Sequence, residues 1–201
     1  MNKIRVGRCG IILLAAGRSS RMGNPKQLLP YKGKSLLVHA ANTAIATGLT
    51  PVIVVLGADG QLMEKELVAE EGLKIIFNRD WEEGMASSIR CGIKEALEMD
   101  PDLDGVIIMV CDQPFVGPKL LKKLLDTQHE TGLPIVSSHY NSSPGVPALF
   151  HKSFFEALLG LKGDTGARKL LKECKELVAI VDFPEGKIDI DTKDDYAGLK
   201  T

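Results

Sequence analysis

The chain has 201 residues, of which 44% are hydrophobic, and its formal net charge is -1. This length suits one domain with a well-formed core and is short for two, so we expect a single domain over residues 1–201, with residues 1–9 as a short leader. A net charge near zero gives no overall field for a polyanion, which argues against nucleic acid as a partner. No segment approaches the ~20 apolar residues of a membrane span, so we expect no membrane insertion.

Cysteine usage indicates a reducing compartment. The four cysteines are widely spaced and form no C-x-x-C pair, which argues against a zinc site and against a disulfide scaffold. Reduced thiols in a cytoplasmic protein are the simplest explanation. Cys111 is expected to be a small buried residue and not a nucleophile.

Short runs rich in isoleucine and valine alternate with longer segments of helical period. This alternation predicts an α/β fold with a mostly parallel, Rossmann-like sheet and helices on both faces. In chain order, strands are expected near 10–15, 51–56, 73–77, 104–110 and 133–138. Helices are expected near 35–47, 60–70, 85–98, 117–131, 152–159 and 165–174, and short strands near 147–150 and 177–191 complete the sheet. Ligands bind outside the carboxyl ends of such strands, so loops 16–27 and 111–114 should share one face.

The first predicted strand runs directly into a basic loop that contains glycine. A strand that ends in small residues brings bare backbone N–H groups close to an anion. Arg18, Arg21 and Lys26 add positive charge around the same place. The loop therefore has the character of a triphosphate site.

This loop is neither of the two best-known phosphate loops. Gly33, Lys34 and Ser35 end like a P-loop, but Leu28 stands where the required earlier glycine would be, so Lys34 and Ser35 are better explained as a turn and a helix N-cap. A dinucleotide fingerprint needs further glycines soon after the first, and residues 19 and 20 are serines. The sequence predicts a third type of phosphate loop.

Two acidic segments are candidates for metal binding. Asp112 comes directly after the strand run and could either cap the helix expected from Gly117 or bind Mg²⁺ together with triphosphate oxygens. In the segment 188–191, isoleucine and aspartate alternate, which in a strand would place Asp189 and Asp191 on one face. For segment 188–191 taken alone, a half-buried edge strand with a solvated acidic face is the preferred interpretation.

The segment 14–27, L-A-A-G-x-S-x-R-M-G-x-x-K-Q in pattern, resembles the opening signature of nucleotidyltransferases, most closely the molybdenum cofactor cytidylyltransferase family. Segments at 78–88, 111–114, 145–150 and 189–192 match in the same order, and the run 163–168 also fits. One such motif would be weak evidence, but the ordered set spans roughly residues 10–200. The resemblance implies the fold of the nucleotide-diphospho-sugar transferases.

The same resemblance implies an Mg²⁺-dependent transfer of CMP from CTP to a phosphorylated pterin, the molybdopterin form of the molybdenum cofactor, with release of pyrophosphate. It assigns Arg21, Lys26 and Asp112 to catalysis. Asp112 and Asp191 would bind Mg²⁺, with Asp189 as the weaker candidate. The expected nucleotide contacts are Leu14, Ala15, Ala16, Gly17, Arg18, Ser19, Lys26, Gly84, Met85 and Ser88.

Several of these residues also have a plain structural explanation. Arg18 could be a solvated loop residue, and Ser87 and Ser88 could simply satisfy the first amides of a helix. Trp81 could be a lid over the nucleotide or a packing residue. Ala16 stands where related guanylyltransferases have glycine, and its added methyl should favour a pyrimidine over a purine by ~1–3 kcal/mol.

The resemblance assigns Gly145, Pro147 and Arg168 to the acceptor. The sequence departs from the family at Val146, where histidine is common, and at Lys193, where proline is common. The first departure leaves the acceptor open between a pterin and another phosphorylated compound, such as a sugar or alcohol phosphate. An ion pair between Arg168 and Glu173 on a helix surface is an alternative to the ligand role.

A protein without catalytic activity that binds and hands over the cofactor is a further alternative. The joint presence of Lys26, Asp112 and Asp191 argues against it, because binding alone would not require all three. If the product is the finished cofactor, a molybdoenzyme or its maturation chaperone would be a partner.

Overall fold

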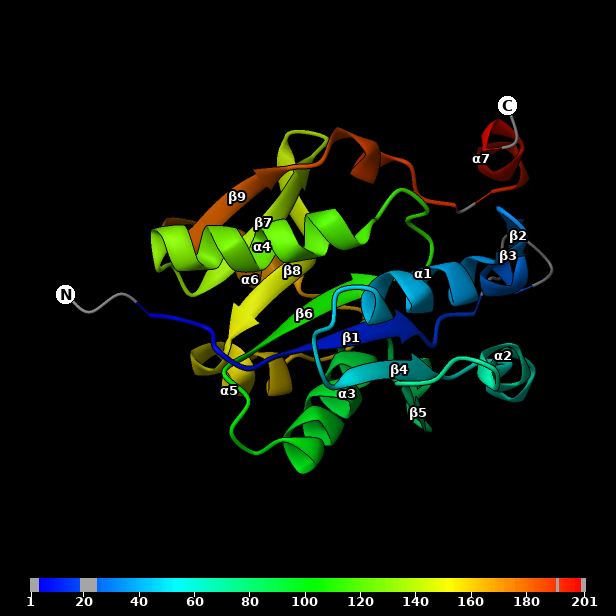
Figure 1. Ribbon diagram of the computed structural model, residues 1–201, viewed down its shortest axis with the longest axis horizontal. Coiled ribbons are helices and arrows are strands. Elements are labelled where there is room, and N and C mark those ends of the chain that lie inside the picture. The colour runs from blue at the N-terminus through cyan, green and yellow to red at the C-terminus, as the bar shows by residue number, and fades with distance from the viewer. Residues whose placement is uncertain (1–3, 19–24, 191, 200–201) are drawn as a thin grey trace.

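A computed structural model of the chain describes residues 4–18, 25–190 and 192–199. Its centre is a seven-stranded sheet in the order β5-β4-β1-β6-β8-β7-β9, and a two-stranded sheet pairs β2 with β3 (Figure 1). The strands are β1 (Cys9–Ala15), β2 (Pro30–Tyr31), β3 (Lys34–Ser35), β4 (Val52–Leu56), β5 (Lys74–Phe77), β6 (Gly105–Val110), β7 (Ile135–Tyr140), β8 (Ser143–His151) and β9 (Val178–Asp182).

Helices cover both faces of the sheet, as the alternation of apolar segments predicts (Figure 1). The α-helices are α1 (Leu36–Ile45), α2 (Gly60–Leu67), α3 (Met85–Met99), α4 (Pro118–Thr131), α5 (Phe155–Leu159), α6 (Arg168–Glu173) and α7 (Lys193–Gly198). Short 3₁₀ turns are η1 (Lys26–Leu28), η2 (Trp81–Glu83), η3 (Lys152–Phe154), η4 (Lys175–Leu177) and η5 (Pro184–Lys187). None of the described helices is both long enough and apolar enough to cross a membrane.

The two faces of the sheet have separate cores because side chains alternate along each strand. In β1, Ile11 and Leu13 join the cluster that α1, α2 and α4 cover, whereas Ile12 and Leu14 join the cluster under α3, α5 and α6. All but the last of these four side chains are fully buried. A continuous apolar run is what a strand buried on both faces requires, and it fixes β1 in the middle of the molecule.

Helix boundaries follow ordinary capping chemistry. The Ser35 hydroxyl accepts a hydrogen bond from the Val38 N–H at 3.4 Å, so the predicted N-cap is confirmed. Helix α4 has Pro118 at its start and ends at Gly132, which has a φ of 70°. Helix α3 runs one residue beyond the predicted 85–98.

The prediction of a short strand at 147–150 is wrong in length, because β8 runs from Ser143 to His151 and is antiparallel to both β6 and β7. Proline and glycine at 144, 145 and 147 normally argue against a strand. Here the Ser137 hydroxyl accepts from the Gly145 N–H at 3.0 Å and donates to the Gly145 carbonyl at 2.8 Å. These side-chain bonds replace ladder bonds at a bulge in β7.

The prediction of strand up to residue 191 is also wrong. Strand β9 ends at Asp182, η5 follows with proline at its first position, and residues 188–190 have no regular structure. Ile190 is fully buried in a small cluster with Tyr31 and Leu36. The alternation of isoleucine and aspartate therefore reflects the burial of Ile190 and not a strand.

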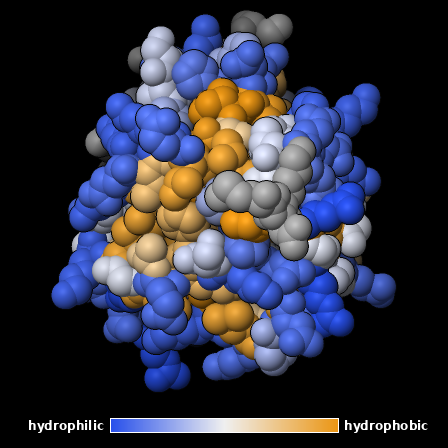
Figure 2. Space-filling model, turned by 90° about the vertical axis from the view of Figure 1, so that its left-hand side faces the viewer, coloured by the Kyte–Doolittle hydropathy of each residue, from blue (hydrophilic) through white to orange (hydrophobic). Residues whose placement is uncertain are grey.

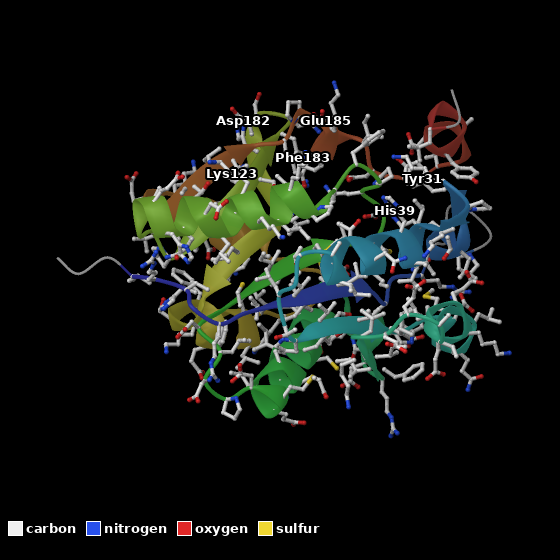
Figure 3. The ribbon with its side chains drawn as sticks, in the orientation of Figure 1. Tyr31, His39, Lys123, Asp182, Phe183 and Glu185 are labelled. Carbon is white, nitrogen blue, oxygen red and sulfur yellow. The ribbon has the colours of Figure 1, made fainter. Side chains whose placement is uncertain are left out.

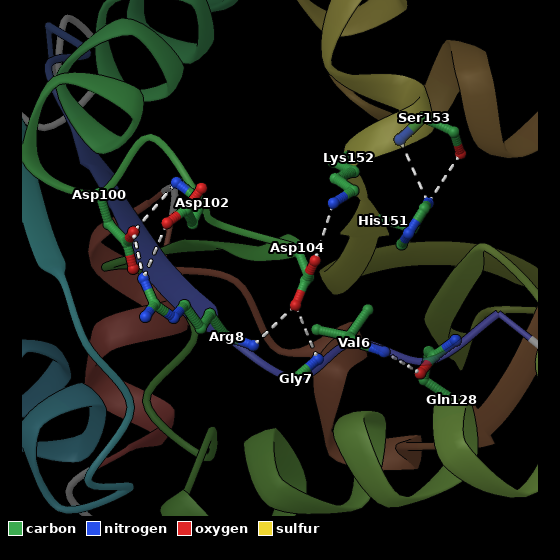
Figure 4. A network of polar contacts seen from close by, with 10 residues as sticks. All are labelled: Val6, Gly7, Arg8, Asp100, Asp102, Asp104, Gln128, His151, Lys152 and Ser153. Carbon is green, nitrogen blue, oxygen red and sulfur yellow. Dashed lines mark hydrogen bonds and ion pairs between the residues drawn. The ribbon is translucent and has the colours of Figure 1, made fainter.

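Residues 6–8, which precede β1, are bound to the rest of the domain by hydrogen bonds (Figure 4). Val6 is fully buried, and its N–H donates to the Gln128 side chain at 3.0 Å. The Asp104 carboxylate accepts from the backbone N–H groups of Gly7 and Arg8 and from Lys152, whose Nζ lies 2.9 Å away. Of residues 4–8, which lead into β1, only Val6 joins the core, and the other four are exposed.

The two ends of the sheet differ in character. Strands β1 and β4 point towards the α2 side of Figure 1, and Figure 2 shows the opposite end of the molecule, where an apolar stretch lies between polar margins. Strands β5, β4, β1 and β6 are parallel, so their carboxyl ends lie on one side of the molecule. Ligand sites in open sheets lie at those carboxyl ends.

Candidate active site

A cleft of about 500 Å³ opens at the carboxyl ends of β1 and β6, which pair in register with Leu14 opposite Val110. Residues 14–18, Lys26 and Gln27 line it from one side. Residues 110–112 line it from the neighbouring strand. The expectation that the two loops share one face is confirmed for their described residues 16–18, 26–27 and 111–112.

Lys26 and Asp112 form an ion pair in this cleft, with Nζ and Oδ2 2.5 Å apart. Their side chains are 17% and 20% exposed, so the charges are partly removed from water but still accessible to a ligand. The N-cap of α4 is Gly117, and the Asp112 carboxylate accepts from Lys26 and from no described amide of α4. The predicted neighbours Arg21 and Ser19 lie outside the described residues.

Gln27 supports the basic loop from behind. Its side chain is 2% exposed, and its amide Nε2 donates to the carbonyls of Ala15 at 3.2 Å and Gly17 at 2.8 Å. These bonds fix the end of β1 against the start of η1. Arg18, the next residue after Gly17, is exposed and lines the cleft.

The opposite wall is made by residues 81–88. Gly84 has a φ of 114°, and a Cβ at this position would lie 2.7 Å from the backbone of Asp164. The hydroxyls of Ser87 and Ser88 accept from the Asn78 side-chain amide at 2.7 Å and 3.0 Å. Neither serine satisfies a first-turn amide, and Ser88 lines the cleft together with Gly84 and Met85.

Ala16, Gly57 and Trp81 pack together at one end of the cleft. A Cβ on Gly57 would lie 2.7 Å from the Ala16 carbonyl oxygen and 2.8 Å from the Ala16 methyl carbon. It would also lie 2.7 Å from the Trp81 Cβ. Trp81 both packs against the core and lines the cleft, so the two expectations for this residue are compatible.

A second compartment of about 320 Å³ adjoins the first. The residues that line both compartments are Leu14, Met85, Val110, Asp112 and Asp164. The second compartment continues over α3 and β8 to residues 166–168. Asp112 therefore stands where two potential ligands would meet.

Arg168 lines the second compartment and binds Tyr140. Its guanidinium donates to the Tyr140 hydroxyl at 3.1 Å and lies over the ring, 5.6 Å from the centroid. The alternative ion pair with Glu173 is not formed, since Glu173 pairs with Lys169 at 3.9 Å. The predicted acceptor residue is thus turned towards the cleft.

Gly145 and Pro147 are not among the described residues that line either compartment. A Cβ at Gly145 would overlap the Tyr140 hydroxyl, so glycine is needed there for packing. The Pro147 carbonyl accepts from the Ser138 hydroxyl at 2.7 Å, which holds β8 to β7. Val146, between them, does line the second compartment.

The acidic segment before α7 reaches the same cleft. The Ile190 N–H donates to the Asp112 carbonyl at 3.1 Å, and Asp189 lines the second compartment. Asp191 lies outside the described residues. Carboxylate oxygens are the ligands that Mg²⁺ prefers, usually one or two together with phosphate oxygens, so Asp112 and Asp189 fit such an ion. Among the described residues, no cluster of three or more potential metal ligands is present.

Cys111 is unsuited to nucleophilic catalysis, as the sequence predicts. Burial raises the pKa of its thiol to about 12, and the adjacent Asp112 carboxylate acts in the same direction. The thiolate is the reactive form, and at such a pKa it is negligible at neutral pH. The chemistry of the cleft therefore rests on charge and positioning.

Sequence reasoning missed Gln27, Gln113, Tyr140 and Asp164 as functional residues, and gave Asn78 no role. Asp164 lines both compartments. Tyr140 accepts a hydrogen bond from Arg168 on α6, which follows it by 28 positions in the chain. The matches at 14–27, 78–88, 111–114 and 163–168 contain four of these five residues, but a motif match does not show which residues are in contact. Only the folded chain brings them together.

Comparison with known proteins supports a nucleotide site. A family model described as the MobA-like NTP transferase domain matches residues 11–178. The chain is 34% identical to a nicotine blue oxidoreductase of Paenarthrobacter nicotinovorans, over 90% of this chain and 91% of that protein. It is 30% identical to the purine catabolism protein PucB of Bacillus subtilis (strain 168), over 92% of both chains. A molybdenum cofactor cytidylyltransferase of Escherichia coli is 25% identical over 94% of both chains.

Similar solved structures include Rv0371c from Mycobacterium tuberculosis. It superposes with a TM-score of 0.80 at 29% identity, covering 97% of this chain and all of the other. A structure of the same protein in complex with manganese has a TM-score of 0.79 at 28% identity, covering 96% and 98% of the two chains. At least one protein similar to this chain thus binds a divalent metal ion.

Proposed function

The chain belongs to the MobA-like NTP transferase family and is a nucleotidyltransferase, and we propose that it transfers CMP from CTP to the phosphate of a molybdopterin. The observation that carries the proposal is the pair of adjoining compartments that meet at Asp112. The first compartment would take the nucleotide and the second the phosphorylated acceptor. Their junction is where an acceptor oxygen would approach the α-phosphorus.

In this reaction an acceptor phosphate oxygen attacks the α-phosphorus of CTP and pyrophosphate leaves, so no covalent intermediate with the protein is required. Lys26 would stabilise the charge that develops on the α-phosphate oxygens, together with Arg21 of the adjacent loop. The compartment walls would hold both reactants in line. Gln27 would keep the backbone N–H groups after β1 in position for the triphosphate.

Asp112 is the first proposed Mg²⁺ ligand, with Asp189 or Asp191 as the second. The ion supplies Lewis acidity towards phosphate oxygens when it is bound. In the structure the Asp112 carboxylate neutralises Lys26 across 2.5 Å. A bound nucleotide and its cation would separate that pair, because each partner would gain a stronger ligand of opposite charge.

The proposed preference for CTP rests on the wall formed by Ala16, Gly57 and Trp81. Ala16 and Trp81 both pack closely against Gly57, so the wall has little room to move away from a larger base. A pocket that must reject one extra ring atom or methyl group discriminates by about 1–3 kcal/mol. Gly84 and Ser88 would approach the base from the opposite side.

The acceptor proposal rests on Arg168 and on the relatives. The cytidylyltransferase named for the molybdenum cofactor is similar along nearly the whole chain, and PucB is named for purine catabolism. A sugar or alcohol phosphate is the second candidate acceptor, favoured by Val146 in the compartment wall, where the family often has histidine. A molybdoenzyme or its maturation chaperone would receive the product, in the cytoplasm.

A second candidate function comes from the 34% identity to a protein named as an oxidoreductase. An oxidoreductase would use the first compartment for a reduced dinucleotide. Against this, the loop after β1 lacks the glycine pattern of dinucleotide sites, and the Lys26–Asp112 pair suits a triphosphate and its metal. Reduction of a coloured acceptor by a reduced dinucleotide, followed as the loss of the dinucleotide's absorbance, would support this candidate.

The donor proposal is tested by the thermal stability of the protein with CTP, GTP, UTP or ATP, each with and without Mg²⁺. A ligand at ~100 times its Kd adds about 2.7 kcal/mol to the free energy of unfolding. We expect a selective shift with CTP that requires Mg²⁺. A larger shift with GTP would refute the CTP assignment, and a shift with NADPH alone would favour the oxidoreductase.

A further inference from the structure

Arg168 is the only cationic residue among the described residues that line the second compartment. Asp112, Asp164 and Asp189 line the same space, yet Arg168 has no ion pair with any described carboxylate. Its recorded partner is a neutral phenol, which leaves its charge uncompensated. An uncompensated guanidinium in a cleft is suited to binding an anion, for which its planar fork provides several donors.

The Tyr140 hydroxyl uses all of its hydrogen-bonding positions, and one of these bonds holds Arg168. Its single proton is donated to the Val146 carbonyl at 3.0 Å. Its oxygen accepts from Arg168 at 3.1 Å and from the Gln113 amide, also at 3.1 Å. A hydroxyl has one donor and two acceptor positions, so all three are used.

Gln113 holds Tyr140 from the loop that follows β6. Its side chain is 4% exposed, and its Nε2 also donates to the Gly186 carbonyl at 3.2 Å. A carbonyl only accepts hydrogen bonds, so this contact fixes which way the amide faces. The network therefore connects residue 113, beside Asp112, to residue 168 on α6.

The ring of Tyr140 is enclosed by two glycines. A Cβ at Gly145 would overlap its hydroxyl, and a Cβ at Gly186 would lie 2.6 Å from its Cδ1. Phe183, labelled in Figure 3, packs edge-on against the ring with centroids 6.3 Å apart. The ring is thus held by close packing, so it can serve as a fixed support for the guanidinium.

We propose that Tyr140, held by Gln113, is a positioning residue that presents Arg168 to an anionic phosphate group of the acceptor. This inference rests on the proposed function, because it assigns the second compartment to the acceptor. The aromatic face and the hydroxyl together restrict the rotamers of Arg168, so less conformational entropy is lost when the anion binds. Lys26 and Asp112 would act on the donor.

The test is a double-mutant cycle of Tyr140→Phe and Arg168→Ala, with inorganic phosphate as the probe. The Kd for phosphate is measured calorimetrically with CTP and Mg²⁺ present, and the Kd for CTP is measured separately. We expect Arg168→Ala to weaken phosphate binding at least about tenfold, as for a charge-assisted bond. Tyr140→Phe should weaken it about two- to tenfold in the wild-type background and have no effect in Arg168→Ala, because Tyr140 acts through Arg168.

Tyr196→Phe is the matched control, since the Tyr196 hydroxyl donates to the Pro30 carbonyl at 2.7 Å, outside both compartments. This variant should leave the phosphate Kd unchanged. An equal loss for Tyr140→Phe in both backgrounds, no loss at all, or no phosphate binding by the wild type would overturn the inference. If CTP fails to bind but the cycle shows the expected coupling, the donor proposal fails and the role of Tyr140 stands.

Discussion

Asp112 is the side chain on which the proposed chemistry depends most, because it borders both compartments and pairs with Lys26. We predict that Asp112→Ala lowers the rate of nucleotidyl transfer by roughly 10²–10³-fold, since both metal binding and the placement of Lys26 are lost. Steady-state pyrophosphate release measures this. Asp126→Ala, an exposed position on α4, is the control and should keep full activity. Intact turnover in Asp112→Ala would refute the metal assignment.

Gly84 is required both for its backbone conformation and for its close contact with Asp164. Gly84→Ala should lower the free energy of unfolding by about 2–4 kcal/mol, from the left-handed backbone and the overlap combined, and raise the KM for CTP. Gly72→Ala separates the two causes, because Gly72 has a φ of 84° and no atom within 4 Å of an added Cβ. Urea unfolding should show a loss of only about 1–2 kcal/mol there. Equal losses in the two variants would contradict the contact.

Single residues differ in how far the sequence reveals their roles. Lys26 and Asp112 lie in loops that the order of the strands predicts to share one face, whereas their ion pair is known only from the structure. Gly145 has a packing role that the motif alone does not reveal, because the reason is the Tyr140 hydroxyl. The roles of Gln113 and Tyr140 depend on bonds between distant segments, for which a single sequence holds no local signal.

The loop before α6 is hydrogen-bonded to the start of α3. These bonds connect residues 81–88, the donor wall in the first compartment, to residues 166–168, the acceptor wall in the second. The Ala86 N–H donates to the Gly163 carbonyl at 3.1 Å. Arg90 on α3 donates to the Leu161 carbonyl at 2.7 Å and binds Glu83 through both carboxylate oxygens. The hydrogen bond with Arg90 holds the pKa of Glu83 below its usual range. Movement of either wall should therefore affect the other.

We predict that Arg90→Gln loosens this connection and raises the KM values for CTP and for the acceptor together. Hydrogen exchange of the amides at 163–167 should become faster, because local opening no longer breaks the Arg90 bonds. Arg79→Gln, an exposed position before η2, is the matched control and should leave both KM values unchanged. A rise in only one KM would show that the two walls are independent.

Strands could be predicted from the sequence where a short apolar run is explained only by a buried strand. Strands β1, β4, β5 and β6 are short runs of isoleucine, leucine and valine, and their positions agree with the prediction within a few residues. The later strands were harder, because the serines that complete β8 lie on β7 and supply bonds that no local pattern shows. The end of β9 and the irregular path to Asp189 were not predictable either, because contacts with distant segments hold Ile190 in place.

The molecule as a whole should lose stability in acid in two stages. Burial lowers the pKa values of His39 and His151 below the ordinary histidine value of about 6.5, so the unfolded chain binds these protons more readily. His39 lies edge-on to Tyr31, 4.8 Å between centroids, with Nε2 3.2 Å from the Pro114 carbonyl (Figure 3). The hydrogen bond from Lys152 likewise lowers the pKa of Asp104.

Each of these groups stabilises the fold above its ordinary pKa, and that stability is lost as pH falls through the lowered value. The free energy of unfolding should therefore be flat between pH ~7 and pH ~8, fall below pH ~6.5 as the histidines become protonated, and fall again below pH ~4 with Asp104 and Glu83. Replacing His39 and His151 by glutamine should remove the first stage only. Urea titrations across this pH range measure it, and a first stage that persists in the double variant would contradict the assignment.

The central claim is that the chain joins CMP from CTP to a phosphorylated pterin. It is tested most directly by incubating the protein with Mg²⁺, molybdopterin and each of CTP, GTP, UTP and ATP, and measuring pyrophosphate release with mass spectrometry of the pterin product. We predict release with CTP, a pterin product that is heavier by one CMP unit, and no product from Asp112→Ala. Release with GTP alone, or release from CTP only when a sugar or alcohol phosphate replaces the pterin, would contradict the claim.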